Sequence, residues 1–450
     1  MQSDPGATSA TAIQKPSFKE AFLFWLKLGF ISFGGPAGQI GIMHEFIVEQ
    51  KKWVSDSRFL HALNYCMLLP GPEAQQLATY IGWLLHGVRG GLVAGILFVL
   101  PSVFILLGLS MVYVTYGTIP WVAALFYGLK PAVVAIVALA LIKIGKKALV
   151  NWLHYVLALL SFILIYFLDV PFPLIILGAM VVAVVMLKFS PGSLQHRNAE
   201  EKEASDESGY YINAATVAPE TGFSWKRIAT QIAAALLLWA LPFLLFYTLL
   251  QDFSFWNKLT MFFTKAALVT FGGAYAVLPY VAQVTVEKFN WLSNYQMIDG
   301  LALGETTPGP LIMVLAFVGF MAGYNHFAGS LLMGTVGLLT TTYYTFLPCF
   351  LFILAGAPII ERTHSNASIK AVLSIVTAAV VGVILNLTVY FGQAVVLGKA
   401  GGMLSVDYFS LAWIIVSIFA MYRFKVGMIP WIGVSALAGL VMYLFGYYQP

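Results

Sequence analysis

The residues of this chain that are best suited to chemistry come in two matched sets. Each set consists of a lysine, then Phe-Gly-Gly, then Trp-x-Ser, then Pro-Gly-Pro, and every member of the second set follows its counterpart by 238 positions (265 − 27, for example). Four motifs that keep one spacing without an insertion indicate an internal repeat, so two related halves are predicted. The sets are Lys27, Phe33-Gly34-Gly35, Trp53-Val54-Ser55 and Pro70-Gly71-Pro72, then Lys265, Phe271-Gly272-Gly273, Trp291-Leu292-Ser293 and Pro308-Gly309-Pro310.

The two lysines are candidates for an anion site. Lys27 and Lys265 each fall within an apolar stretch that is predicted to be a membrane helix, where a charged side chain costs at least about 2.5 kcal/mol. A single lysine of this kind is explained by snorkelling to the membrane surface. Two lysines at matching positions in inverted halves favour a pair of cations that face each other near a pseudo-two-fold axis. Such a pair suits an anion, and a dianion most of all.

The glycine pairs point to the same chemistry. A helix that breaks at Gly-Gly leaves backbone N–H groups free, and the next half-helix begins with a partial positive charge. Such helix ends bind tetrahedral oxyanions without many charged side chains. The alternative is that these small residues only allow close helix packing. The residues assigned to this part of the site are Ser32, Gly34, Gly35, Thr270, Gly272 and Gly273.

Each Pro-Gly-Pro is predicted to separate two half-helices, because the first proline ends a helix and the second suits the first turn of another. Polar residues follow this break in the first copy and precede it in the second. Carboxylates inside a membrane are functional candidates by default, so proton coupling is a hypothesis beside a purely structural role. The residues assigned here are Pro70, Gly71, Glu73, Gln75, Gln76, Glu305, Thr306, Thr307 and Gly309.

The composition is that of a membrane protein. Hydrophobic residues make up 60% of the 450 residues, charged residues make up 10%, and the mean hydropathy is +0.86, whereas a soluble domain has about 25% charged residues. Several apolar runs reach the roughly 20 residues that cross a bilayer. The lipid bilayer is therefore an expected partner, and no basic cluster interleaved with aromatic residues suggests nucleic acid.

The sequence lacks the motifs of ATP-driven and redox proteins. It contains no G-x-x-x-x-G-K-[ST] loop, no HExxH, no paired CxxC and no dinucleotide fingerprint. Its two cysteines, Cys66 and Cys349, lie far apart in apolar stretches and are interpreted as buried small residues. We therefore expect no enzyme activity, no metal site and no cofactor.

Hydropathy divides the chain into five parts. The one long polar stretch is rich in Ser, Glu and Ala, which is typical of a disordered linker. The predicted fold is an all-α polytopic membrane protein of two inverted halves with broken helices, with about thirteen transmembrane segments if every broken segment crosses the membrane. The parts are a flexible tail (1–17), the first half (18–189), a cytoplasmic linker (190–225), a connecting transmembrane helix (226–250) and the second half (251–450).

Basic residues predict the orientation. With the N-terminus in the cytoplasm, loops such as the one that holds Lys146 and Lys147 fall inside, as the positive-inside rule requires. Lys51, Lys52 and Arg58 would then fall outside, unless the broken segments turn back within the membrane. The sequence leaves open whether these segments cross or turn back.

The motifs resemble those of the chromate ion transporter family in its long, two-domain form. The matching strings are SFGGPAGQIGIMHEFIVEQKKWVSD, LLPGPEAQQLATYIGWLLHG and GGLVAGILFVLPS in the first half, and TFGGAYAVLPYVAQ and GLALGETTPGPLIMVLAFVGF in the second. The resemblance covers roughly residues 18–115 and 258–390. The second half departs from the first-half pattern at Ala274 and Leu311, which stand where the first half has Pro36 and Glu73, so the halves are not expected to be equivalent at the site.

The resemblance implies a multi-pass protein of the inner membrane that exports chromate and confers chromate resistance, with sulfate as a competing look-alike. It carries over to Lys27, to Phe33-Gly34-Gly35-Pro36, and to Pro70-Gly71-Pro72-Glu73 with Gln75 and Gln76. A sulfate importer or anion channel of the same fold is the first alternative, and a membrane chromate reductase, which would need a redox cofactor, is the second. Proton antiport, uniport and a homodimer are left open.

Overall fold

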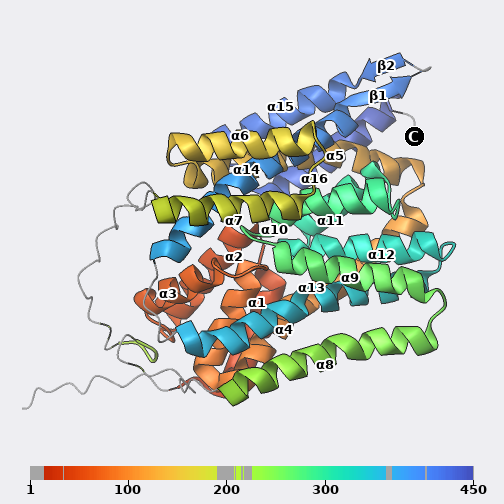
Figure 1. Ribbon diagram of the computed structural model, residues 1–450. Helices are drawn as coiled ribbons and strands as arrows, with labels where there is room; N and C mark the ends of the chain where they lie inside the picture. Colours follow the sequence, from red (N-terminus) through yellow and green to blue (C-terminus); the bar gives the residue numbers. More distant parts are fainter. Residues whose placement is uncertain are drawn as a thin grey trace, which may run out of the picture.

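The computed structural model of the chain (Figure 1) is almost entirely helical. It describes residues 15–33, 35–189, 207, 209–213, 216, 225–360, 367–400 and 403–448. Gly34, most of the predicted tail and most of the predicted linker lie outside the described residues. The one departure from helix among named elements is a short antiparallel hairpin of β1 (Leu397–Ala400) and β2 (Met403–Val406).

The prediction of an all-α polytopic membrane protein is confirmed. Six helices of the described chain are long and apolar enough to cross a membrane, and shorter apolar helices accompany them. The six are α4 (Glu73–Tyr116), α5 (Pro120–Ala148), α7 (Phe172–Phe189), α8 (Trp225–Leu249), α13 (Leu331–Ile360) and α14 (Ala367–Val396).

The first half begins with two helical hairpins. In the first, α1 (Phe18–Ile31) is followed by α2 (Gly35–His44) and its π-helical continuation η1 (Glu45–Gln50). The Lys51 ammonium lies 2.8 Å from the Glu20 carboxylate, which joins the end of η1 to the start of α1. Because the end of η1 meets the start of α1, this segment turns back.

The second hairpin also returns to its own side. It consists of α3 (Asp56–Cys66) and the first part of α4, which breaks at His86 and Gly87, where the φ angles are −138° and 63°. The His86 Nε2 atom lies 2.9 Å from the carbonyl oxygen of Pro16, directly before α1. The open ends of both hairpins thus lie together, and their tips lie in the interior.

The second half repeats this arrangement. The start of its first hairpin meets the end of its second, because Asp252 lies 2.7 Å from His326, and the Asn325 amide donates to the carbonyl of Trp291 at 2.8 Å. The hairpin elements are α9 (Phe253–Val269), α10 (Ala274–Ala282), η3 (Gln283–Lys288), α11 (Asn294–Thr306), η4 (Leu311–Met313) and α12 (Val314–His326).

The remaining helices interlock the two halves. Helix α5 packs against the last hairpin of the second half, and α14 packs against the last hairpin of the first. Helix α8 runs along the lower edge of Figure 1, beside α9 and α13, and has no buried residue, as expected of a helix that faces lipid. The last hairpins consist of α6 (Trp152–Tyr166) with α7, and α15 (Tyr408–Arg423) with α16 (Met428–Leu444).

The hairpins revise the predicted count of thirteen crossings. If the two broken segments of each half turn back, the candidates for crossings in the described chain are the six long helices and, among the shorter apolar helices, α6, α15 and α16. The sequence counted each broken segment as a crossing because its length alone, without the contacts between its two ends, allows either path.

The hairpins also resolve the conflict over the basic loop before α3 and the start of that helix, where Lys51, Lys52 and Arg58 would fall outside if every broken segment crossed the membrane. The backbone of Tyr211 and Ile212, in the stretch that joins the halves, donates to the carbonyls of Lys52 and Trp53 at 3.1 and 3.0 Å. The Arg58 guanidinium donates to the carbonyl of Asn213 at 3.0 Å. The loop and the linker therefore lie on one side of the membrane.

Candidate functional site

The tips of the four hairpins meet in the interior through a pair of matched hydrogen bonds. The backbone N–H of Gly71 donates to the carbonyl of Thr270, and the N–H of Gly309 donates to the carbonyl of Ser32, both at 2.7 Å. Each bond links a Pro-Gly-Pro tip of one half to the end of the first hairpin helix of the other half. The structure thus brings together the two motif types that the sequence singled out.

Only glycine fits the centre of each Pro-Gly-Pro tip. The φ angles of Gly71 and Gly309 are 125° and 99°, in the region that L side chains avoid. A Cβ atom on Gly71 would lie 2.7 Å from the Cys349 sulfur, and one on Gly309 would collide with the Ser102 hydroxyl. The tips are therefore close-packed turns that leave no room for a side chain at Gly71 or Gly309.

Helix N-termini without side-chain caps follow the tips. Helices α4 and α10 and the turn η4 begin directly after the tips, and their N-cap residues Pro72, Gly273 and Pro310 make no side-chain capping hydrogen bond. The first N–H groups of a helix have no partner within it, and they carry the positive end of the helix dipole. This is an arrangement that binds anions, oxyanions in particular.

Buried polar side chains with unsatisfied oxygens lie among the tips. Among the described residues, the Ser32 hydroxyl and the amide oxygens of Gln39 and Gln76 are buried without a hydrogen-bond partner. The other end of each amide holds a tip, since Gln39 donates to the carbonyl of Gly309 and Gln76 to that of Pro70. Buried polar groups are normally satisfied, so these atoms mark a place for water or a ligand.

Gln39 was not among the predicted site residues. It lies in the SFGGPAGQ string, four residues after Gly35, and this spacing of one helical turn from the break is the signal that could have found it. Gln75, which was predicted, has a different environment. Its amide donates to the Thr79 hydroxyl at 3.1 Å, and it packs against Gly95, within the interface between the two parts of α4.

Two carboxylates lie at the tips. The Glu73 carboxylate points to the Gly-Gly turn of the other half, 4.0 Å from where a Cβ of Gly273 would be. Glu305 is 3% exposed and accepts a hydrogen bond from the Tyr275 hydroxyl at 2.5 Å. Tyr275 lies one residue after Ala274, the position where the second half lacks the proline, and was not predicted.

The predicted threonines contribute less than expected. Thr270 and Thr307 donate to carbonyls of their own helices at 2.6 and 2.7 Å, and the Thr306 hydroxyl bonds to its own helix in the same way. Their hydroxyls are occupied, whereas that of Ser32 is not. The two halves therefore differ at matching positions, as the sequence differences predicted.

The two predicted lysines lie in separate surroundings. The Lys27 ammonium lies 5.3 Å from the centre of the Phe46 ring in its own half, and Lys265 lines a pocket beside α9. Both side chains are exposed, and no contact joins them in the part of the chain that the structure describes. The expected pair of facing cations is therefore not formed, because each lysine points away from the buried face of its helix.

A buried ion pair ties the halves together beyond the tips. Asp299 of α11 lies 3.7 Å from the Lys130 ammonium of α5 and accepts a hydrogen bond from the Tyr113 hydroxyl at 2.9 Å. Both cysteines are buried and free. Among the described residues, no group of three His, Cys, Asp or Glu side chains could hold a metal ion.

Ser32→Ala is expected to raise the KM for the transported oxyanion by about tenfold. A hydrogen bond to a charged group contributes about 1.5–3 kcal/mol, and about 1.4 kcal/mol corresponds to a factor of ten. Ser110→Ala is the matched control, because that buried hydroxyl bonds only the Leu106 carbonyl of its own helix. Initial uptake rates across a range of oxyanion concentrations provide the measurement. Equal KM values for both variants would remove Ser32 from the site.

Comparisons with known proteins identify relatives of the chain. The family model described as chromate transporter matches residues 19–184 and 256–440. The chain is 29% identical over 447 residues to the chromate transport protein of Cupriavidus metallidurans, covering 98% of this chain and 97% of that one. It is 32% identical over 399 residues to the chromate transport protein of Pseudomonas aeruginosa, covering 86% and 85%. No solved structure matches.

Proposed function

This chain belongs to the chromate transporter family, and from that premise we propose that it is a secondary transporter that exports chromate and confers resistance to it. The observation that carries the proposal is the crossed pair of hydrogen bonds from Gly71 to Thr270 and from Gly309 to Ser32. Near these bonds, at the seam between the two halves, lie helix N-termini without side-chain caps and buried polar side-chain atoms without a hydrogen-bond partner, which supports the proposal. In transporters with inverted repeats, substrates bind at such seams.

Tetrahedral oxyanions suit the chemistry of this centre. The backbone N–H groups at the tips and the Ser32 hydroxyl can donate to oxyanion oxygens, and no cation needs to be buried with them. Sulfate has the same shape and charge as chromate, so it is the expected competitor. The naming of the Cupriavidus and Pseudomonas relatives as chromate transport proteins supports chromate as the substrate.

Export needs no nucleotide. In a cell with a negative interior, moving a dianion outward releases about 4.6 kcal/mol per 100 mV, twice the value for one charge. The membrane potential alone can therefore drive the transport. Glu73 and Glu305 at the tips offer two carboxylates that could exchange protons, so a proton gradient is the second source of energy in the proposal.

The proposed orientation places the N-terminus and the linker in the cytoplasm, in the inner membrane. The linker side of the nine-crossing topology then carries most of the basic residues, as the positive-inside rule requires. The side opposite carries Asp169, Asp252 and Asp407, together with the smaller number of lysines on α9 and η3. The basic residues on the linker side include Lys51, Lys52, Arg58, Lys143, Lys146, Lys147, Lys188, Lys226, Arg227, Arg423 and Lys425.

Cysteine labelling tests this topology. In intact spheroplasts, a membrane-impermeant maleimide should label Ser254→Cys and leave Gln50→Cys unlabelled, and in everted vesicles the pattern should reverse. Both positions are exposed, and the native cysteines are buried, so they give little background. Labelling of both positions from the same side would contradict the hairpin topology, because a crossing first segment would place Gln50 outside.

An efflux experiment tests the direction. Cells that express the chain are loaded with radiolabelled chromate and moved to chromate-free medium, and vector-only cells serve as the control. Faster loss of label with the protein present is the expected result. Equal loss, together with faster uptake of label during loading, would replace export with import by the same site.

A further inference from the structure

A charged pocket lies on the outer flank of the second half, away from the hairpin tips. It has a volume of about 600 Å³ and lies between α9, the α10–η3 helix and the start of α7. Three lysines and two carboxylates line it, together with Gln283 and aromatic residues: Lys258, Lys265, Lys288, Asp169 and Glu287. This content is unusual for a part of the molecule that is surrounded by apolar helices, where charge is costly.

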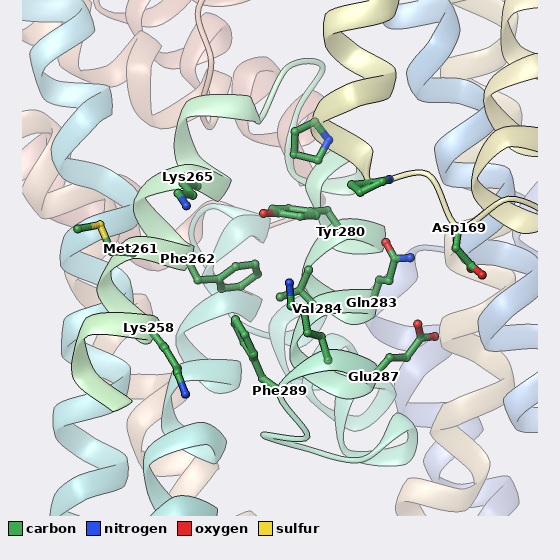
Figure 2. A pocket seen from close by; sticks show the side chains of 13 residues that line it. Asp169, Lys258, Met261, Phe262, Lys265, Tyr280, Gln283, Val284, Glu287 and Phe289 are labelled. Carbon is green, nitrogen blue, oxygen red and sulfur yellow. The ribbon is translucent and has the colours of Figure 1, made fainter. Parts of the chain in front are cut away.

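The charges of the pocket are separated in space. Figure 2 shows Lys258 and Lys265 on α9 at one wall, with Asp169 and Glu287 at the opposite wall and Gln283 between them. The two lysines are seven residues apart, which is about two helical turns or roughly 10 Å along one face. The α9 wall therefore presents two cations without a carboxylate between them.

The first half lacks this cationic surface. Counting back by the repeat of 238, Lys258 corresponds to Glu20 and Lys288 to Gln50, while Lys265 corresponds to Lys27. Glu20 is paired with Lys51. The cluster of lysines is thus a property of one half only, and because the halves are inverted, it is a property of one side of the membrane.

We propose that the lysines of this pocket, Lys258, Lys265 and Lys288, form a second oxyanion site at the mouth of the transporter opposite the linker, and that this site holds the anion on its way to or from the central site. The proposal rests on the proposed oxyanion transport and deepens it. An aqueous pocket explains why lysines on α9 are exposed within the membrane layer, since they face water and not lipid tails. Release or capture of a dianion at this mouth would depend on Lys258 and Lys288 through charge.

The same chemistry could come from two sources, a free oxyanion or the phosphate headgroup of an anionic lipid. Radiolabelled sulfate binding to the purified full-length protein separates them. It is measured in nanodiscs of phosphatidylcholine alone and in nanodiscs that also contain phosphatidylglycerol. A free-anion site binds sulfate equally in both, whereas a lipid site loses sulfate binding when phosphatidylglycerol is present.

The informative variant is Lys258→Gln with Lys288→Gln, which leaves Lys265 and the hairpin tips intact. Lys19→Gln with Lys188→Gln is the matched control, because it removes the same charge from exposed positions on the linker side. We expect the pocket variant to weaken sulfate binding at this site about tenfold and to flatten its salt dependence, with the control unchanged. If the pocket variant binds sulfate with the affinity and salt dependence of the wild type, the proposal for a free oxyanion is overturned. If phosphatidylglycerol competes with sulfate as strongly in the pocket variant as in the wild type, the lipid source is overturned.

The failure of this proposal can be told apart from failure of the central one. If the pocket variant binds sulfate and transports chromate like the wild type, while Ser32→Ala impairs transport, the central site stands and the outer site falls. Suppose instead that the wild-type protein binds sulfate but does not transport chromate, and that the variant Lys258→Gln with Lys288→Gln loses sulfate binding. The outer site then stands and the transport assignment falls.

Discussion

Gly309→Ala will abolish chromate transport. The φ angle of Gly309 is 99°, which alanine adopts only with strain. A Cβ atom there would also collide with the Ser102 hydroxyl, which donates to the neighbouring carbonyl of Pro308. The tip must therefore shift, and with it the hydrogen bond from the Gly309 N–H to Ser32. We expect a loss of transport of at least about a hundredfold, since two effects of about 1–3 kcal/mol combine.

Gly108→Ala is the control for this change. Gly108 lies within α4, and a Cβ at that position meets nothing within 4 Å, so transport should be unchanged. Radiolabelled chromate uptake into vesicles with matched amounts of protein gives the measurement, and gel filtration in detergent verifies folding. Wild-type uptake by Gly309→Ala would show that the crossed bonds do not support the site.

Glu73→Gln will separate the two driving forces. The Glu73 carboxylate faces the Gly273 turn across the seam, where it is in position to respond to the oxyanion that binds at the adjoining helix ends. If this carboxylate exchanges protons during transport, the amide variant loses uptake driven by a pH gradient, by about tenfold or more, and keeps uptake driven by voltage. The measurement imposes each gradient alone on proteoliposomes.

Glu45→Gln is the matched control, because Glu45 is an exposed carboxylate on η1 outside the tips. It should respond to both gradients like the wild type. Loss of voltage-driven uptake in Glu73→Gln, to the same extent as pH-driven uptake, would contradict a role in proton coupling and assign Glu73 to binding or structure.

The positions of the helix breaks and the division into two matched halves could be predicted from the sequence, because they depend on local motifs and on repetition. Gly-Gly and Pro-Gly-Pro favour breaks in helices, and a constant offset of 238 implies matched halves. The breaks in the helices were predicted on this basis, whereas the sequence left open whether the broken segments cross or turn back. In the structure, hydrogen bonds of Gly71 and Gly309 join the breaks of the two halves.

The rest depended on contacts between distant segments. The choice between crossing and turning back is decided by pairs such as Lys51 with Glu20, whose two members lie far apart in the chain. The prediction that Lys27 and Lys265 face each other was wrong for a related reason. The buried face of α1 includes Phe24 and Leu28, so Lys27 points elsewhere, and a shared position in the repeat does not fix which way a side chain points.

Site residues that have no polar counterpart at the corresponding position of the other half were the hardest to predict. Gln39 corresponds to Val277 in the other half, and Tyr275 corresponds to Ala37. A search for repeated polar residues therefore passes over both, although each contacts a tip or a carboxylate of the site. Their roles arise from the differences between the halves, and these are visible only after the hairpins are packed.

Uptake of radiolabelled chromate into everted membrane vesicles tests the central claim most directly. The vesicles are energised, and then either the voltage or the pH gradient is collapsed with an ionophore, with excess sulfate in parallel. We predict energised uptake that sulfate reduces and that falls when the driving gradient is collapsed. Uptake no greater than in vesicles without the protein would contradict oxyanion export by this chain.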